Sequence, residues 1–211
     1  MEFDITAMKQ RAKGIIRETK PSPWILGIFF MVLTLFYEGA VMVLSSMAAI
    51  SGKWAFLGFV AIELVFVLFR SSCRWYALKL AREESTALSD GIGAWREQLF
   101  PALFLGIIKD ICYVIGWGLL FVGFLFFFYW FRMAVFVVKD GENNPFMALR
   151  ESKRLLKGHY MELIKLDLSN LGWHSLNIIT LGVASVYVRP YMAIVYAEFY
   201  GYLKAQENLF G

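Results

Sequence analysis

Four apolar stretches, separated by shorter polar segments, dominate the pattern of this chain. They cover residues 23–50, 54–80, 99–138 and 160–203. Because a helix needs about 20 apolar residues to cross a bilayer, each of the first two stretches predicts one membrane-spanning helix. The last two are roughly twice that length, so each is expected to fold back as a helical hairpin. The chain is therefore predicted to be an all-α polytopic membrane bundle of about six transmembrane helices in three hairpins.

Polar or glycine-containing turns bound the six expected spans. In chain order the spans cover residues 24–46, 54–76, 99–117, 119–138, 161–183 and 186–203. Residues 1–211 are thus expected to form a single integral membrane domain.

Two amphipathic segments are expected to lie outside the spans, one within the leader at residues 1–22 and one within residues 140–159. In each, apolar residues follow one helical face and basic residues the other. Such helices lie on a membrane surface with their basic side toward headgroups and water. The residues predicted to bind that surface are Lys9, Lys13, Arg17, Arg150, Lys153, Arg154 and Lys157.

The second amphipathic segment carries clear end signals. Asn144 is suited to cap a helix, Pro145 to occupy its first turn and Gly158 to end it. A helix is therefore predicted over residues 145–157, and the first segment predicts a helix over residues 3–20.

Lysine and arginine placement predicts the orientation. Lys and Arg gather in the leader, around the second connection and in the third connection, whereas the opposite turns hold only Lys53 and Arg189. The basic residues around the second connection are Arg74, Lys79, Arg82 and Arg96. Because basic loops stay in the cytoplasm, both termini are expected there. The formal net charge of +4 is thus a topology signal, and nucleic acid is not an expected partner.

The composition agrees with a membrane protein. Hydrophobic residues make up 59% of the chain, and the mean hydropathy is +0.56. An ordinary globular domain is nearer one half apolar, which argues against that class. Cys73 and Cys112 fall inside or at the end of apolar segments, so we interpret them as small core residues. No disulfide, metal site or cofactor is expected.

Ionisable residues inside the spans are the strongest functional signal, because each costs a few kcal/mol to insert and usually faces a bundle interior or wet cavity. An alternative is that they form closed ion pairs between helices, or that the basic ones reach toward the interface. Lys109, Lys165, Asp167 and Arg189 belong to this group. The residues predicted to line a substrate or ion path are Glu38, Glu63, Asp110, Arg132 and Glu198.

The fifth span adds polar side chains to this picture. His174, with Asn170 and Asn177, predicts a polar stripe that reinforces the cavity. No strained nucleophile turn, second histidine ligand or phosphate-binding loop accompanies them. The protein is therefore not expected to be an enzyme, nor to drive transport with ATP by itself.

A family resemblance rests on the C-terminal third of the chain. Its residues are Ala148 to Gly158, Gly172-Trp173, Leu181-Gly182, Pro190-Tyr191 and Phe199-Tyr200. Here the chain resembles the bacterial integral membrane family called domain of unknown function 975. That family is distantly similar to the membrane part beside some glycerophosphodiester phosphodiesterases. The resemblance implies a multi-pass protein of the bacterial cytoplasmic membrane and no particular activity. Family members usually have Pro-Gly between the third and fourth spans, where this chain has only Gly123.

Two functions from different classes remain open on these grounds. The first is a small transporter or lipid-handling protein, whose acids bind a cation, a proton or a cationic group. In it Arg132 sets the charge state of the acids or holds an anionic headgroup. The alternative is a non-catalytic accessory subunit that binds and stabilises or regulates another membrane protein complex. The expected partners are membrane lipids and either another membrane protein or further copies of this chain.

Overall fold

The computed structural model describes residues 3–20, 22–48, 52–84, 87, 89, 92, 99–118 and 122–210. Within these residues the regular structure is helical, which confirms the all-α prediction. The helices are α1 (Ile5–Glu18), α2 (Trp24–Ala48), α3 (Gly52–Ala81), α5 (Leu99–Gly118), α6 (Val122–Lys139), α7 (Pro145–Leu156), α8 (Tyr160–Ser169), α9 (Leu171–Ile179) and α10 (Ser185–Phe210).

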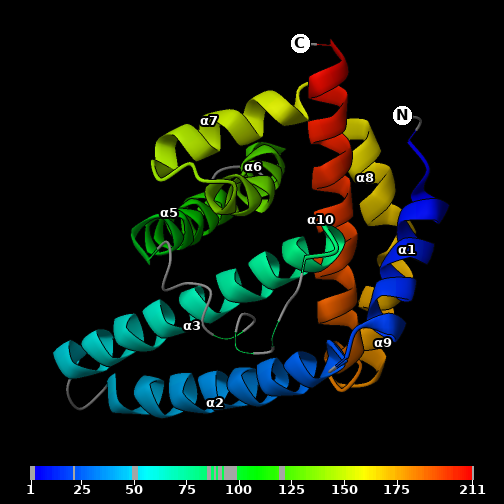
Figure 1. The fold of residues 1–211 in the computed structure, drawn as a ribbon. Coiled ribbons are helices and arrows are strands. Elements are labelled where there is room, and N and C mark those ends of the chain that lie inside the picture. Colours follow the sequence, from blue (N-terminus) through cyan, green and yellow to red (C-terminus); the bar gives the residue numbers. More distant parts are fainter. Residues whose placement is uncertain are drawn as a thin grey trace.

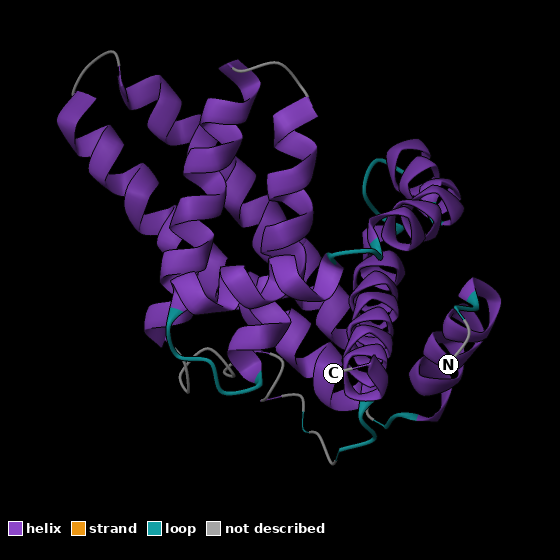
Figure 2. Cartoon of the chain, turned by 90° about the horizontal axis from the view of Figure 1, so that it is seen from above, coloured by secondary structure: helices purple, strands orange, loops and turns teal. Residues whose placement is uncertain are grey.

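Helices α2 and α3 form one antiparallel hairpin, and α5 and α6 form a second (Figure 1). Both hairpins extend in the same direction from a common base, as Figure 2 shows from above. These four helices match the first four predicted spans closely, because runs of apolar residues interrupted by polar or glycine turns determine their limits. The turn between the third and fourth predicted spans, residues 119–121, lies outside the described residues.

Two of the described helices are long and apolar enough to cross a membrane, Trp24–Met47 and Gly52–Ala81. In the most apolar 18-residue segment of each helix, only 17% and 11% of the residues are buried. A core helix of a soluble protein would be mostly buried, so these helices present their apolar side chains to the surroundings. Exposed Val32, Leu35 and Phe36 on α2 are examples.

Helix α10 runs across the base of both hairpins rather than alongside them (Figures 1 and 2). Its middle is enclosed by other helices, with Tyr191, Val195, Phe199 and Tyr200 all fully buried. The predicted six-span bundle is therefore not confirmed. Apolar length alone does not distinguish a helix that faces lipid from one buried inside the protein.

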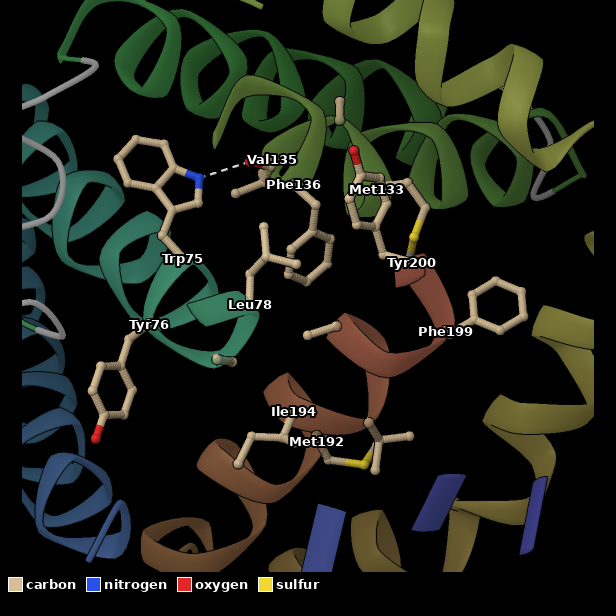
Figure 3. Packing of buried hydrophobic residues seen from close by; sticks show 14 of the residues in the cluster. Trp75, Tyr76, Leu78, Met133, Val135, Phe136, Met192, Ile194, Phe199 and Tyr200 are labelled. Carbon is tan, nitrogen blue, oxygen red and sulfur yellow. Dashed lines mark hydrogen bonds between the residues drawn. The ribbon is translucent and has the colours of Figure 1, made fainter. Parts of the chain in front are cut away.

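The core forms where α3, α6 and α10 meet (Figure 3). The indole Nε1 of Trp75 donates a hydrogen bond of 2.6 Å to the Val135 carbonyl, which ties α3 to α6. The rings of Phe136 and Tyr200 stack with centroids 5.5 Å apart, which ties α6 to α10. The base of the hairpins is thus the tightly packed part of the molecule.

The predicted fifth span is divided into α8 and α9 at Asn170. Asn170 has φ −98° and ψ 0°, outside the ideal helical values. Asparagine and the nearby Gly172 have low helix propensity, which accounts for a break at this place. Pro190 falls in the second turn of α10, which begins at Ser185.

The two amphipathic helices are confirmed as α1 and α7. The Asn144 side chain accepts hydrogen bonds from the backbone N–H groups of Phe146 and Met147 at 3.0 and 3.4 Å. Gly158 adopts φ +92°, so it ends this segment as expected. Both helices bury an apolar side against the protein, with Ala12 on α1 and Ala148 on α7 fully buried.

Replacing Asn144 with alanine should lower the free energy of unfolding by about 1 kcal/mol, because two N–H groups of α7 lose their acceptor. Thermal melting of the purified protein in detergent would measure this. Asn143→Ala is the matched control, since the adjacent exposed Asn143 does not cap the helix. Equal melting temperatures for the two variants would show that the cap contributes no stability.

Candidate functional site: a basic cavity at the base of the hairpins

A cavity of about 450 Å³ lies between the two hairpins and helices α9 and α10. We call it the basic cavity because its described lining contains four arginines, one lysine and no carboxylate. The basic residues are Arg70, Arg74, Lys109, Arg132 and Arg189. Aromatic rings form much of the remaining wall, from Phe30, Phe66, Phe131, Phe136 and Tyr196. The cavity therefore combines positive charge with apolar surface.

Arg189 enters the cavity from α10, and its hydrogen bonds to the described residues are made with neutral oxygens. Its Nη1 donates to the Phe30 carbonyl at 3.1 Å and to Thr34 Oγ1 at 2.6 Å, both on α2. These bonds hold the guanidinium in place without neutralising it. A partly buried charge of this kind favours an anion nearby.

Arg70 is oriented by a network on the first hairpin. Its Nη2 lies 3.2 Å from Glu63 Oε1, and its guanidinium lies 5.1 Å from the centre of the Phe66 ring. Tyr37 donates a hydrogen bond of 2.6 Å to Glu63 Oε2 and stacks on Phe66. Glu63, predicted as a path residue, therefore supports Arg70 from behind and does not line the cavity.

Arg132 joins three helices. Its Nη1 lies 2.6 and 2.9 Å from the two carboxylate oxygens of Asp167 on α8. The Tyr196 hydroxyl on α10 donates to the same carboxylate at 2.5 Å, and the guanidinium lies 4.4 Å from the Tyr196 ring centre. Arg132 and Asp167 are 14% and 22% exposed, so this pair is a partly buried structural link as well as one wall of the cavity.

His174 and Asn177 line the cavity from α9, which agrees with the predicted polar stripe. The side-chain oxygen of Asn177 is buried and has no hydrogen-bond partner among the described residues. An asparagine amide can present either its oxygen or its NH₂ group, so this side chain can donate to a ligand. Asn170, predicted on the same stripe, is fully buried elsewhere and does not line the cavity.

The predicted path residues are not brought together. Glu38 is exposed on α2, and Glu198 of α10 lies 3.4 Å from Arg11 Nε on α1. The side chain of Asp110 lies outside the described residues. Of the four path residues with described side chains, only Arg132 lines the basic cavity.

Sequence reasoning missed the roles of Arg70 and Arg74. Arg74 served only as a topology signal, although the two arginines are four residues apart and so share one face of α3. The four-residue spacing of these arginines, after the apolar part of the helix, was the sequence signal that could have indicated a shared site. Lys109 and Arg189 were recognised as ionisable residues within spans but were not assigned to the path.

The predicted surface residues fall into two groups. Lys13, Arg17, Arg150, Lys153, Arg154 and Lys157 are exposed. Lys9 instead donates a hydrogen bond of 2.6 Å to the Ser169 carbonyl at the end of α8, and burial, together with nearby Lys13, lowers its pKa. The hydrogen bond with Glu151 raises the pKa of Arg154, which also contacts Glu207 on α10. Arg154 thus links α7 to α10.

The described residues form an all-helical protein with two apolar hairpins and a basic cavity at their base. Residues 124–207 match the family model described as "Protein of unknown function (DUF975)". Over this segment the predicted resemblance to that uncharacterised family is confirmed. Neither the curated proteins nor the solved structures gave a match.

Proposed function

We propose that this chain is a multi-pass protein of the bacterial cytoplasmic membrane that binds an anionic ligand in the basic cavity, as a small transporter or lipid-handling protein. In this proposal the two hairpins cross the membrane, and α10 lies across their cytoplasmic ends. The predicted fifth and sixth spans become elements at the membrane boundary, because α10 runs across the hairpins.

Charge placement supports this orientation. Arg82 and Lys139 lie at the base ends of the hairpins, whereas Lys53 lies near the tip of the first. Because basic residues stay on the cytoplasmic side, the base and both termini face the cytoplasm. The exposed apolar residues Ile178 and Ile179 support a position of α9 at the membrane boundary in this proposal.

The charge of Arg189 is the observation that best supports an anionic ligand. The sequence favoured a cation held by acids, but the described cavity lining contains no carboxylate. The contacts of Arg189 are to a carbonyl and a hydroxyl, so its charge is left for a ligand. Arginines present a planar fork of donors that suits carboxylate and phosphate groups.

Native mass spectrometry of the full chain, extracted gently from its membrane, tests this proposal. The wild-type protein is expected to retain an anionic molecule of defined mass. Arg189→Gln should reduce this adduct by at least tenfold, which corresponds to about 1.4 kcal/mol of binding free energy. Lys53→Gln is the matched control, because it removes one exposed positive charge distant from the cavity lining, and it should leave the adduct unchanged.

Two results would reject the proposal. One is an adduct retained equally by wild type and Arg189→Gln. The other is a wild-type protein that carries no anion but holds a different polypeptide at a fixed ratio. The second result would favour the accessory-subunit function.

A further inference from the structure

We propose that the ligand of the basic cavity bears a phosphate group, and that this phosphate is the headgroup of an anionic phospholipid from the cytoplasmic leaflet. The inference rests on the proposed function and names its ligand class. Three features carry it: the depth of the cavity, its pairing of guanidinium groups with aromatic rings, and the apolar outer surface of the first hairpin.

The depth of the cavity follows from helix length. At 1.5 Å per residue, Arg70 and Arg74 lie about 27 and 33 Å along α3 from its first residue, Gly52. The hydrocarbon core of a bilayer is about 30 Å thick. If α3 starts at the outer boundary, these arginines lie at the inner boundary, which is the level of the phosphates in the cytoplasmic leaflet.

The walls of the cavity match the two halves of a lipid. Arg189, Arg70 and Arg74 supply donors for phosphate oxygens, and arginine binds such oxygens through two parallel hydrogen bonds. Phe30 and Phe136 supply apolar surface that a free inorganic anion does not use. A ligand with a charged head and an apolar body fits both.

The outer surface of the first hairpin is apolar. Apolar side chains of α2 and α3 face outward along the length of the hairpin, Phe36 and Phe56 among them. A lipid chain can therefore remain in hydrocarbon while its headgroup sits among the arginines. The exposed basic residues of α1 and α7 would attract anionic lipid to the same side.

The test uses the full chain in dodecyl maltoside micelles after removal of native lipid. Palmitoyl-oleoyl phosphatidylglycerol, the corresponding phosphatidylcholine and inorganic phosphate are titrated separately, and one-to-one adducts are counted by native mass spectrometry. Phosphatidylglycerol should bind at least tenfold more tightly than phosphatidylcholine, because the choline cation would face the arginines. Millimolar inorganic phosphate should not displace it.

Two variants distinguish the contribution of the Arg189 charge to lipid binding from that of the cavity volume. Arg189→Gln should weaken phosphatidylglycerol binding at least tenfold. Ala193→Leu narrows the cavity from α10 without changing its charge, and it should weaken lipid binding while Lys53→Gln does not. Melting temperatures of all variants are recorded, so that a misfolded variant is recognised.

The outcomes distinguish this inference from the proposed function. If inorganic phosphate binds in an Arg189-dependent manner and phosphatidylglycerol does not, the inference fails while the proposed anion site stands. If neither binds and Arg189→Gln does not alter the native adducts, both fail. If both lipids bind equally in several copies and Arg189→Gln has no effect, they are surface lipid and the inference fails.

Discussion

Gly27→Ala is expected to be among the most destabilising single substitutions in the described part of the chain. A Cβ atom at this position would lie 1.6 Å from the Val186 carbonyl oxygen, so α2 and α10 would have to move apart. Overpacking of this kind typically costs 1 to 3 kcal/mol, and because the opposing atom is backbone we expect about 3 kcal/mol. The apparent melting temperature in detergent should fall by roughly 6 to 12 °C.

The close approach at Gly27 depends on the neighbouring proline. Pro190 has no N–H group, so the Val186 carbonyl four residues earlier lacks its usual helical donor. This carbonyl faces α2 where Gly27 leaves room. The same crossing of α2 and α10 brings the Phe30 carbonyl within hydrogen-bonding distance of Arg189. Separation of the two helices would therefore also disturb the basic cavity.

Gly39→Ala is the matched control for this prediction. Gly39 lies on the same helix, and an added Cβ would meet nothing within 4 Å. Alanine has the higher helix propensity by about 1 kcal/mol, so this variant should melt at the wild-type temperature or slightly above. If Gly27→Ala melted at the same temperature as Gly39→Ala, the close crossing of α2 and α10 would be wrong.

Asp167→Asn is expected to destabilise the protein by about 2 to 3 kcal/mol. Removing one partner from a buried ion pair costs about 3 to 5 kcal/mol, because the remaining charge has lost its counter-ion. Arg132 and Asp167 are 14% and 22% exposed, so water would partly compensate and a smaller value is expected. The Tyr196 hydroxyl would also lose a charged acceptor. Denaturant or thermal unfolding in detergent would measure the change.

A double-mutant cycle identifies the ion pair as the cause. Arg132→Met combined with Asp167→Leu removes both charges, and it should cost less than Asp167→Asn alone. Glu18→Gln serves as the control for loss of one acidic charge, since Glu18 is exposed on α1. The cycle also needs the single variants Arg132→Met and Asp167→Leu. If their separate effects on the free energy of unfolding add up to that of the double variant, Arg132 and Asp167 do not interact.

Much of the secondary structure could be predicted because its signals are local. The limits of α2 and α5 follow from apolar runs and the turns beside them. Helix α7 follows from Asn144, Pro145 and Gly158, whose side chains or backbone preferences act within a few residues. The break at Asn170 was missed, because a single polar residue does not distinguish a continuous span from two short helices.

The candidate site was only partly predictable. His174 and Asn177 were expected to face a cavity, since their spacing on one helix is a local property. The presence of Arg70 and Arg189 in one cavity was not expected, because residues on α3 and α10 are brought together only by packing. Likewise, nothing near Glu63 in the chain shows that it supports Arg70 and Tyr37 instead of lining a path.

The sequence by itself determined the class of structure: helices of membrane length, two basic amphipathic helices and a family resemblance over the C-terminal part of the chain. Apolar periodicity, end signals and composition are properties of neighbouring residues, and they suffice for those conclusions. Only the tertiary structure decided that α10 crosses the hairpins and that arginines, rather than acids, form the described lining of the basic cavity. The physical reason is that a cavity is made by side chains from distant segments, and its charge depends on which of them packing brings together.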